Sequence, residues 1–408
     1  MPVPFWHQYT RCRKGGSVHR SNGSGIILPT DVLDRFLEVR APMFSSLQIQ
    51  GYRGLEKFEM SGLQRVNLLV GKNNSGKTSA LEAIFLLATR GDPATLWQVL
   101  WRRGERLSSS VNRTQDRPPD LDISHLFTGH GLRLGTSFRL SARNETPERF
   151  LTFTLSEIKS EKDISERDKQ VRLFPARVGL ELKGYPAPLI KQMPLSQGGG
   201  LDNEVLQSPR RIRREILNEF PAQFITAESL DGTDLISLWD KVALTPNEER
   251  VVAALQFLDL DVQRIAPQVG GQFYYPRGGF IVKVKGHSQP LPIGSMGDGM
   301  WRMLAMAIAI AHCKDGVLLV DEIDTGLHYT VMANMWRLIF GAAADLNVQV
   351  FATTHSSDCI RSLAELCYEE TAVADNVTLQ RIEKGNPEAV PYAAEEIEIA
   401  AERRVEVR

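Results

Sequence analysis

The glycine-rich segment at residues 71–78, GKNNSGKT, holds the clearest chemical pattern of this chain. A glycine, four residues and then Gly-Lys-Thr is the spacing of the phosphate-binding P-loop. An apolar run at 66–70 precedes the segment, and apolar residues at helical spacing follow at 79–87, which is the expected strand–loop–helix context. We therefore predict that the segment binds a nucleoside triphosphate. The predicted binding residues are Gly71, Asn73, Asn74, Ser75, Gly76, Lys77, Thr78 and Ser79.

Two side chains of this segment have predicted roles in catalysis as well as in binding. The loop's backbone N–H groups and the N-terminus of the following helix attract phosphate oxygens. Lys77 would reach the β- and γ-phosphates, and the Thr78 hydroxyl would bind Mg²⁺. The alternative is a glycine turn that binds nothing, and the flanking strand and helix argue against it.

A second apolar strand, at residues 316–320, ends in the acids Asp321 and Glu322. A buried strand that delivers carboxylates at its C-terminal end suits Mg²⁺–nucleotide chemistry at the edge of a parallel sheet. We expect Asp321 to hold the metal, and Glu322 to accept a proton from the attacking water or to orient that water. Such a strand is common by itself, but together with the P-loop it predicts ATP hydrolysis.

Two further segments carry polar residues that suit a phosphate site. The strand at 348–354 ends at His355, whose neutral imidazole is predicted to contact the γ-phosphate and to sense its loss. Residues 293–302 form a serine–glycine turn that opens an apolar helix, which is again an anion site. Because the P-loop already serves the chain's own phosphates, we expect this turn to meet a nucleotide held by another copy. Its predicted binding residues are Ser295, Gly297, Asp298 and Gly299.

Bulk properties restrict the class of protein without identifying it. The 408 residues carry a net charge of −1, which does not by itself indicate nucleic-acid binding. The four cysteines have no metal-ligand spacing, and no apolar run is long enough to span a bilayer. We predict a cytoplasmic protein without a membrane contact. Residues 1–42 are basic and rich in glycine and serine, and are expected to be a disordered tail or a non-native extension before a start at Met43, with the second interpretation favoured.

The pattern of segments predicts an α/β P-loop NTPase with a mixed central sheet flanked by helices. We expect an ATPase lobe with the P-loop at 43–155, a helical or irregular inserted arm at 156–272, and a second ATPase lobe at 273–408. Elements are expected as a helix at 97–112, strands from 132–134 onward through 138–140 and 150–155, and a helix at 242–258. The arginines between 210 and 214 would either bind phosphates or form an ordinary charged helix face.

Taken together, these motifs resemble the ABC-class ATPases, which include SMC-type and RecF-type proteins. More closely, the chain is similar to bacterial AAA-domain ATPases related to the overcoming-lysogenization-defect (OLD) family. The resemblance covers residue 43 to the C-terminus, matches least in the middle region, and rests on segments 71–78, 294–299 and 321–328. It implies a homodimer with two composite sites. ATP would lie on Lys77, Thr78, Asp321, Glu322 and His355 of one subunit, covered by Ser295, Gly297 and Gly299 of its partner.

The chain departs from parts of that class. It lacks the Leu-Ser-Gly-Gly-Gln turn of ABC transporters, and His328 stands where those ATPases have an aspartate, so a transporter subunit is disfavoured. The glutamine that bridges Mg²⁺ and the arm in ABC-type ATPases is not assigned. OLD nucleases add a C-terminal Toprim domain, for which this chain has little room. The pair Asp259 and Asp261 is interpreted as surface acids, so a nuclease would have to be a separate protein.

The resemblance implies an ATP-hydrolysing dimerisation switch in a DNA-linked or anti-phage defence system. Its effector would be a separate protein, a Toprim-type nuclease or a toxin, and DNA is a further candidate partner. Two alternatives stay open. One is an ATP-binding scaffold or sensor with little turnover, and the other is a RecF-like DNA-repair ATPase.

Overall fold

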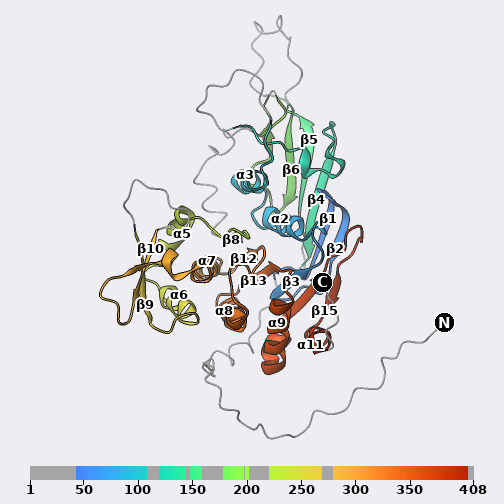
Figure 1. The fold of residues 1–408 in the computed structure, drawn as a ribbon. Helices are drawn as coiled ribbons and strands as arrows, with labels where there is room; N and C mark the ends of the chain where they lie inside the picture. Colours follow the sequence, from blue (N-terminus) through green and yellow to red (C-terminus); the bar gives the residue numbers. More distant parts are fainter. Residues whose placement is uncertain are drawn as a thin grey trace, which may run out of the picture.

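The computed structural model describes residues 43–107, 119–143, 148–158, 178–196, 198–201, 220–268 and 279–402. The N-terminal segment 1–42 and the arginine cluster at 210–214 lie outside these ranges, so the expectations for them are not addressed further by the fold. Two large sheets with helices between and beside them form the main body, and a smaller unit lies at one side (Figure 1).

A mostly parallel sheet forms the centre of the molecule. Its order is β15-β14-β3-β13-β12-β8, and only β15 runs antiparallel to its neighbour. The strands β3, β12 and β13 are buried along their whole length, as expected for parallel strands that are covered on both faces. The strands are β3 (Val66–Val70), β8 (Ala222–Ile225), β12 (Val317–Val320), β13 (Gln349–Thr353), β14 (Val377–Arg381) and β15 (Val390–Tyr392).

An antiparallel sheet of order β2-β1-β4-β5-β6-β7 packs above it. Its strands alternate buried and more exposed residues, which places one face on the core. The edge strand β2 also bonds the loop that precedes β15, since Glu59 N donates to Pro387 O at 2.8 Å. The strands are β1 (Ser46–Tyr52), β2 (Leu55–Met60), β4 (Ser137–Arg143), β5 (Arg149–Glu157), β6 (Val178–Tyr185) and β7 (Gln192–Pro194).

Helix α2 (Lys77–Ala88), which follows the P-loop, lies between the two sheets and contacts strands of both. It is therefore buried on nearly all sides, together with the first part of α3 (Pro93–Arg102). The Asp92 carboxylate caps α3 by accepting from Thr95 N at 3.2 Å. Two short turns, η2 (Ser124–Leu126) and η3 (Thr128–His130), pack near the same end.

The opposite face of the parallel sheet carries the helices of the C-terminal half. Residues of α7, α8 and α9 form one hydrophobic core with that face, whereas α2, α3 and the antiparallel sheet form a second core with the other. The central sheet therefore separates α2 from α7. The helices on this side are α7 (Asp298–His312), α8 (Tyr329–Asp345), α9 (Ser357–Glu369), α10 (Thr371–Ala374) and α11 (Ala394–Glu402).

A smaller unit precedes α7 in the chain and lies beside it in Figure 1. Its antiparallel sheet has the order β11-β10-β9 and leads through η6 into α7. The elements are α5 (Gly232–Trp239), α6 (Pro246–Gln256), β9 (Val262–Pro267), β10 (Phe280–Val284), β11 (Leu291–Pro292) and η6 (Ile293–Met296). None of the helices in the described ranges is long and apolar enough to cross a membrane.

The expected segment limits differ from the structure at several points. The range 156–272, expected as an arm, supplies β6 and β7 to the antiparallel sheet and β8 to the central sheet. The strands expected at 138–140 and 150–155 lie within β4 and β5, but 132–134 form no strand: Leu134 is 56% exposed in a turn, and β4 begins at Ser137. The helix expected at 97–112 spans 93–102, and that at 242–258 spans 246–256, where Thr245 caps it. Strands β6 and β7 continue the consecutive antiparallel run from β4 and β5, whereas β8 joins the central sheet because it pairs with the distant β12, which local composition does not reveal.

Candidate active site

The P-loop connects β3 to α2 through two glycines with left-handed backbones. Gly71 has φ 145°, and a Cβ there would lie 2.2 Å from the Ile382 carbonyl oxygen. Gly76 has φ 107°, and a Cβ there would lie 2.9 Å from Leu55 Cδ2. As the N-cap of α2, Gly76 offers no side chain to the first N–H groups of the helix. These N–H groups can therefore bind an anion.

The Lys77 ammonium lies inside this loop. Its Nζ donates to the carbonyl oxygens of Gly71 at 2.8 Å and Lys72 at 3.0 Å. Burial lowers the pKa of Lys77, and the carboxylates of Asp321 and Glu322 oppose this effect. The buried Ser75 Oγ has no hydrogen-bond partner within the described residues. A buried cation and an unpaired hydroxyl in one loop fit the oxygens of a bound phosphate.

The Thr78 hydroxyl contacts the first acid of the Asp-Glu strand. Its Oγ1 donates to Asp321 Oδ2 at 3.0 Å and lies 3.3 Å from Oδ1. The two residues meet because β3 and β12 flank β13 in one parallel sheet, so their C-terminal ends lie at the same edge. Hydroxyl and carboxylate oxygens are ligands that Mg²⁺ prefers, so this donor set fits that cation.

A single hydroxyl at the end of β13 positions both acids. Thr353 Oγ1 donates to Asp321 Oδ1 at 2.6 Å and accepts from the Glu322 N–H at 2.8 Å. Glu322 has a left-handed backbone, with φ 47°, and its carboxylate accepts from Thr325 Oγ1 at 3.3 Å. Left-handed backbone at a residue other than glycine costs energy, and such sites concentrate where function requires them. The surrounding hydrogen bonds hold Glu322 in this conformation.

His355 lies in the same charged cluster, two residues after the end of β13. Burial lowers the pKa of this half-buried imidazole, and the Lys77 charge lowers it further. The carboxylates of Glu322, Asp324 and Asp321 act in the opposite direction. A neutral imidazole near pH 7 results, which can donate or accept one hydrogen bond.

The turn before α7 lies across the central sheet from α2. Ser295, Gly297 and Asp298 are exposed, and Ser295 Oγ donates to Pro292 O at 2.7 Å. A Cβ on Gly299 would lie 3.1 Å from the Gly326 carbonyl oxygen, so this turn packs against the loop that follows the two acids. The structure thus clusters Lys77, Thr78, Asp321, Glu322 and His355, while the residues of the turn face outward on the other side of the sheet.

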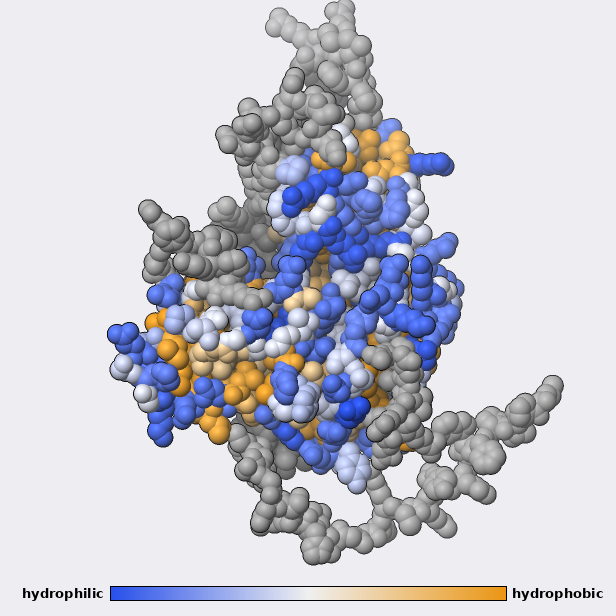
Figure 2. Space-filling view, viewed as in Figure 1, coloured by the Kyte–Doolittle hydropathy of each residue, from blue (hydrophilic) through white to orange (hydrophobic). Residues whose placement is uncertain are grey.

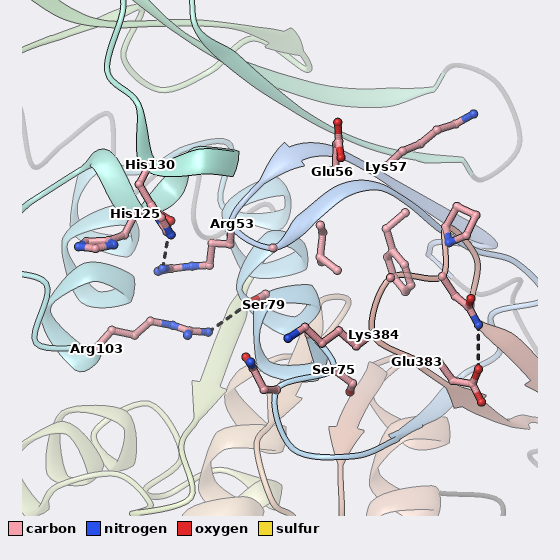
Figure 3. A pocket seen from close by; sticks show the side chains of 18 of the residues that line it. Arg53, Glu56, Lys57, Ser75, Ser79, Arg103, His125, His130, Glu383 and Lys384 are labelled. Atoms are coloured by element: carbon pink, nitrogen blue, oxygen red, sulfur yellow. Dashed lines mark hydrogen bonds between the residues drawn. The ribbon is translucent and has the colours of Figure 1, made fainter.

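A cavity of about 730 Å³ adjoins the outer side of the P-loop (Figure 3). Its size suits a small organic ligand. Its walls come from the β1–β2 turn, the P-loop, the segment after α3, the histidines of η2 and η3, and the loop after β14. The charged side chains on these walls include Arg53, Glu56, Lys57, Arg103, Glu105, Glu383 and Lys384.

Arg103 extends from the end of α3 toward the first turn of α2, as Figure 3 shows. Its Nη2 donates to Ser79 Oγ at 3.3 Å, and its Nε lies 2.7 Å from the Glu82 carboxylate. Glu82 also pairs with the buried Arg53 at 2.7 Å. The sequence motifs did not indicate Arg103, because no residue pattern links the end of α3 to the P-loop. Thr353 had a weaker signal, since it precedes Thr354 and His355 at a strand end.

Two protein-family profiles match separate parts of the chain. The family described as "AAA ATPase domain" matches residues 43–172, and "AAA domain, putative AbiEii toxin, Type IV TA system" matches residues 204–358. A protein named ATP/GTP phosphatase from Helicobacter pylori is 22% identical over 347 residues, which cover 80% of this chain and 89% of that protein. DNA replication and repair protein RecF from Bacillus thuringiensis is 46% identical over 44 residues, covering 11% of this chain and 12% of RecF.

Solved structures of similar fold include heads of SMC proteins. The SMC head bound to the C-terminal winged-helix domain of ScpA has a TM-score of 0.46 and 15% identity, covering 87% of this chain and 99% of that chain. The SMC head domain from Thermotoga maritima has a TM-score of 0.40 and 12% identity, covering 86% and 98%. The predicted fold class is confirmed in its architecture: the described residues form an α/β fold with a mixed central sheet flanked by helices, and the glycine-rich loop joins β3 to α2.

Proposed function

We propose that the protein binds Mg-ATP between two copies of itself and hydrolyses it, so that dimer closure acts as a switch. The observation that carries this proposal is the contact between the Thr78 hydroxyl and the Asp321 carboxylate at 3.0 Å. It joins the P-loop to the Asp-Glu strand in one site. The name of the Helicobacter pylori relative, an ATP/GTP phosphatase, supports nucleotide hydrolysis as the reaction.

Each residue of the cluster has a role in this reaction. Lys77 and the N-terminus of α2 bind the phosphates, and Thr78 and Asp321 would hold Mg²⁺, which when bound supplies positive charge at the β- and γ-phosphates. Glu322 accepts a proton from the attacking water or orients it for in-line attack on the γ-phosphorus. The neutral His355 contacts the γ-phosphate and responds to its loss. Positioning and charge neutralisation supply most of the catalysis.

The cavity beside the P-loop would take the nucleoside. Its lining includes Ser75 and Gly76 of the P-loop and Ser79 in the first turn of α2, so it adjoins the proposed phosphate site. Arg103 lines this cavity and contacts Ser79, so its guanidinium is placed to meet the phosphate closest to the ribose.

The second copy would supply the turn before α7. Ser295, Gly297 and Gly299 lie at the start of a 15-residue helix, and α7 and α2 cover opposite faces of the central sheet. One chain therefore presents its P-loop and its turn on different sides. A two-fold dimer brings each turn onto the partner's nucleotide. ATP then becomes part of the dimer interface, and hydrolysis of ATP allows the two copies to separate.

The biological setting is a further part of this proposal. The description of the second matching family includes a putative AbiEii toxin of a type IV TA system, which supports a role in bacterial defence. The proposal also includes a relationship to the OLD family and a cytoplasmic location. Its effector would be a separate protein, a Toprim-type nuclease or a toxin. RecF-like DNA repair is the second candidate, supported by the 44-residue match. ATP-dependent DNA binding that is lost when Arg210 and Arg211 are reversed in charge would favour it.

The test combines two measurements on the purified chain. Wild-type protein should hydrolyse ATP in a Mg²⁺-dependent single-turnover assay, whereas Glu322→Gln should bind ATP and turn it over only at a small residual rate. Light scattering should show that the mass of Glu322→Gln doubles on addition of Mg-ATP. A wild-type chain that binds ATP without turnover would instead indicate the scaffold or sensor function. A monomer under both conditions would contradict closure between copies.

A further inference from the structure

Arg302 connects the helix of the outward-facing turn to the strand that carries the acids. It lies in the second turn of α7 and is only 2% exposed. Its Nη2 donates to the carbonyl oxygens of Asp321 and Glu322, both at 2.8 Å, and its Nη1 donates to the carbonyl oxygen of Thr226 beyond β8. One guanidinium therefore binds the backbone carbonyls of both acids, Asp321 and Glu322.

The position of this cation is energetically demanding. Burial lowers the pKa of Arg302 to about 10, although the charges of Asp321, Asp324 and Glu322 oppose the shift. The side chain still carries its charge at neutral pH. Burying a charged group is costly unless hydrogen bonds replace water, and here backbone carbonyls do so at both Nη atoms, whereas the buried Nε has no hydrogen-bond partner within the described residues. Changing this side chain would remove one donor from each of these carbonyls, although Glu322 O still accepts from Thr325 N and Thr226 O still accepts from Ser229 N.

A rigid path runs from the turn to the general base. The N–H to carbonyl bonds of α7 make its first two turns move as one unit. Gly299 at the start of this helix packs against the Gly326 carbonyl, and Arg302 one turn later holds the Glu322 carbonyl. A displacement at Ser295 or Gly297 therefore reaches the loop at 321–327 through both contacts.

We propose that Arg302 is a positioning residue that couples the turn at the start of α7 to Glu322 in the same subunit. In this arrangement, the nucleotide held by the partner subunit engages the turn and sets the orientation of the general base across the sheet. The two ATP sites of a dimer are thereby linked. This inference rests on the proposed function, since it requires two copies and hydrolysis.

The chemistry of arginine gives a selective test. The planar guanidinium reaches several carbonyls at fixed angles, whereas a lysine ammonium is a point charge on a flexible stem. Arg302→Lys therefore keeps the charge but loses the fork. Arg65→Lys is the matched control. Arg65 is 6% exposed and donates to Ala343 O, Asn347 Oδ1 and Val348 O, at the other end of the sheet from Glu322.

The experiment measures ATP affinity, single-turnover rate and the Hill coefficient of turnover with the full chain. We expect Arg302→Lys to lower the rate about tenfold to a hundredfold, because a misplaced reacting group has an effect of this order. ATP affinity should stay close to wild type, and the Hill coefficient should fall to about 1 as the sites become independent. Arg65→Lys should retain the wild-type rate and Hill coefficient, even if it lowers the melting temperature as much as Arg302→Lys does.

A double variant shows whether Arg302 acts through Glu322. In a Glu322→Gln background, Arg302→Lys should lower the residual rate no further. An equal loss in both backgrounds, or a wild-type rate and Hill coefficient in Arg302→Lys, would overturn the inference alone. A wild-type chain without turnover would overturn the proposed function and this inference with it. If Arg302→Lys does not fold, Arg302→Gln, which keeps amide donors without a buried charge, replaces it and has the same expected outcomes.

Discussion

At the scale of single residues, the Thr353 hydroxyl has an unusually specific task. It donates to Asp321 and accepts from the N–H of Glu322, so one oxygen fixes the orientation of both acids. Valine has nearly the same shape as threonine, but its methyl group in place of the hydroxyl can neither donate nor accept a hydrogen bond. The residue therefore permits a substitution that removes only the hydrogen bonds.

We predict that Thr353→Val lowers ATP turnover about tenfold or more, because an unpaired backbone N–H and a freed carboxylate cost about 1–3 kcal/mol each. Its Mg²⁺ requirement should rise as well, since Asp321 loses a donor that orients it. Steady-state turnover measured against Mg²⁺ concentration checks both effects. Thr378→Val is the control, because Thr378 is also a buried strand residue that donates to a carbonyl, Tyr392 O. Equal losses in the two variants would contradict a role specific to the acids.

Arg103 gives a prediction about nucleotide affinity. A charge-assisted hydrogen bond to a phosphate oxygen contributes about 1.5–3 kcal/mol, so Arg103→Gln should weaken ATP binding about tenfold or more. Titration with a fluorescent ATP analogue measures this. Arg106→Gln is the matched control, since Arg106 stacks on Trp101 with 4.0 Å between its guanidinium carbon and the ring centroid. If both variants bind ATP as wild type does, the nucleoside does not lie in this cavity.

His355 gives a prediction about protonation. Burial and the Lys77 charge lower its pKa, so it should titrate below the ordinary imidazole value of about 6.5. Lys77→Met removes a positive charge and should raise the pKa of His355, whereas Glu322→Gln removes a negative charge and should lower it. NMR titration measures the pKa of His355 in the wild-type protein and in both variants, and the loss of the signal in His355→Gln assigns it. A shift of the same sign in both variants would show that His355 is not between these two charges.

At the scale of elements, the P-loop conformation depends on where β14 ends. The Ile382 carbonyl follows that strand and lies so close to Gly71 that a Cβ would stand 2.2 Å from it. The φ of 145° excludes most L-residues independently of this contact. The loop is therefore shaped by a neighbouring strand as well as by its own glycines.

We predict that Gly71→Ala destabilises the fold by about 1–3 kcal/mol and abolishes detectable ATP binding, because the loop must move away from β14. Thermal unfolding and ATP titration test this. Gly54→Ala, also at the rim of the site, should be tolerated, since a Cβ there meets no atom within 4 Å and its φ is ordinary. A Gly71→Ala chain that binds ATP normally would mean that this approach to Ile382 is not essential.

At the scale of the whole molecule, the central sheet separates two anion-binding helix starts. The P-loop and α2 belong to one hydrophobic core, and α7 belongs to the other. In the view of Figure 2, hydrophobic residues gather toward the lower left, where Figure 1 places the smaller unit, and hydrophilic residues cover much of the centre and right.

Mixing two inactive variants tests this arrangement. Lys77→Ala disables the P-loop, and Ser295→Arg blocks the turn, so each homodimer should be inactive. A 1:1 mixture should recover turnover above that of either homodimer but below about a quarter of wild type, because half of the dimers are mixed and each of these has one intact composite site. The general base of that site lies in the subunit whose turn is blocked, so coupling through Arg302 would slow it. Multiple-turnover ATPase assays measure the recovery. No recovery, with mixed dimers confirmed by mass, would contradict a turn that acts on the partner's nucleotide.

The amino-acid sequence by itself identified the fold class and the two motifs on which the proposed nucleotide chemistry rests. The P-loop and the Asp-Glu strand are contiguous, and their patterns follow from local needs: left-handed glycines at the loop and a fully apolar strand before the acids. The two motifs meet because β3 and β12 lie on either side of β13 and all three strands are parallel, so their C-terminal ends lie at one edge of the sheet. Tertiary structure alone decided the rest. Arg302, Arg103 and Thr353 act on groups distant in sequence, and β8 pairs with β12, which follows it only after α5, α6 and α7. A guanidinium that binds backbone carbonyls leaves no residue pattern, because every residue has a carbonyl and only packing selects which ones it meets.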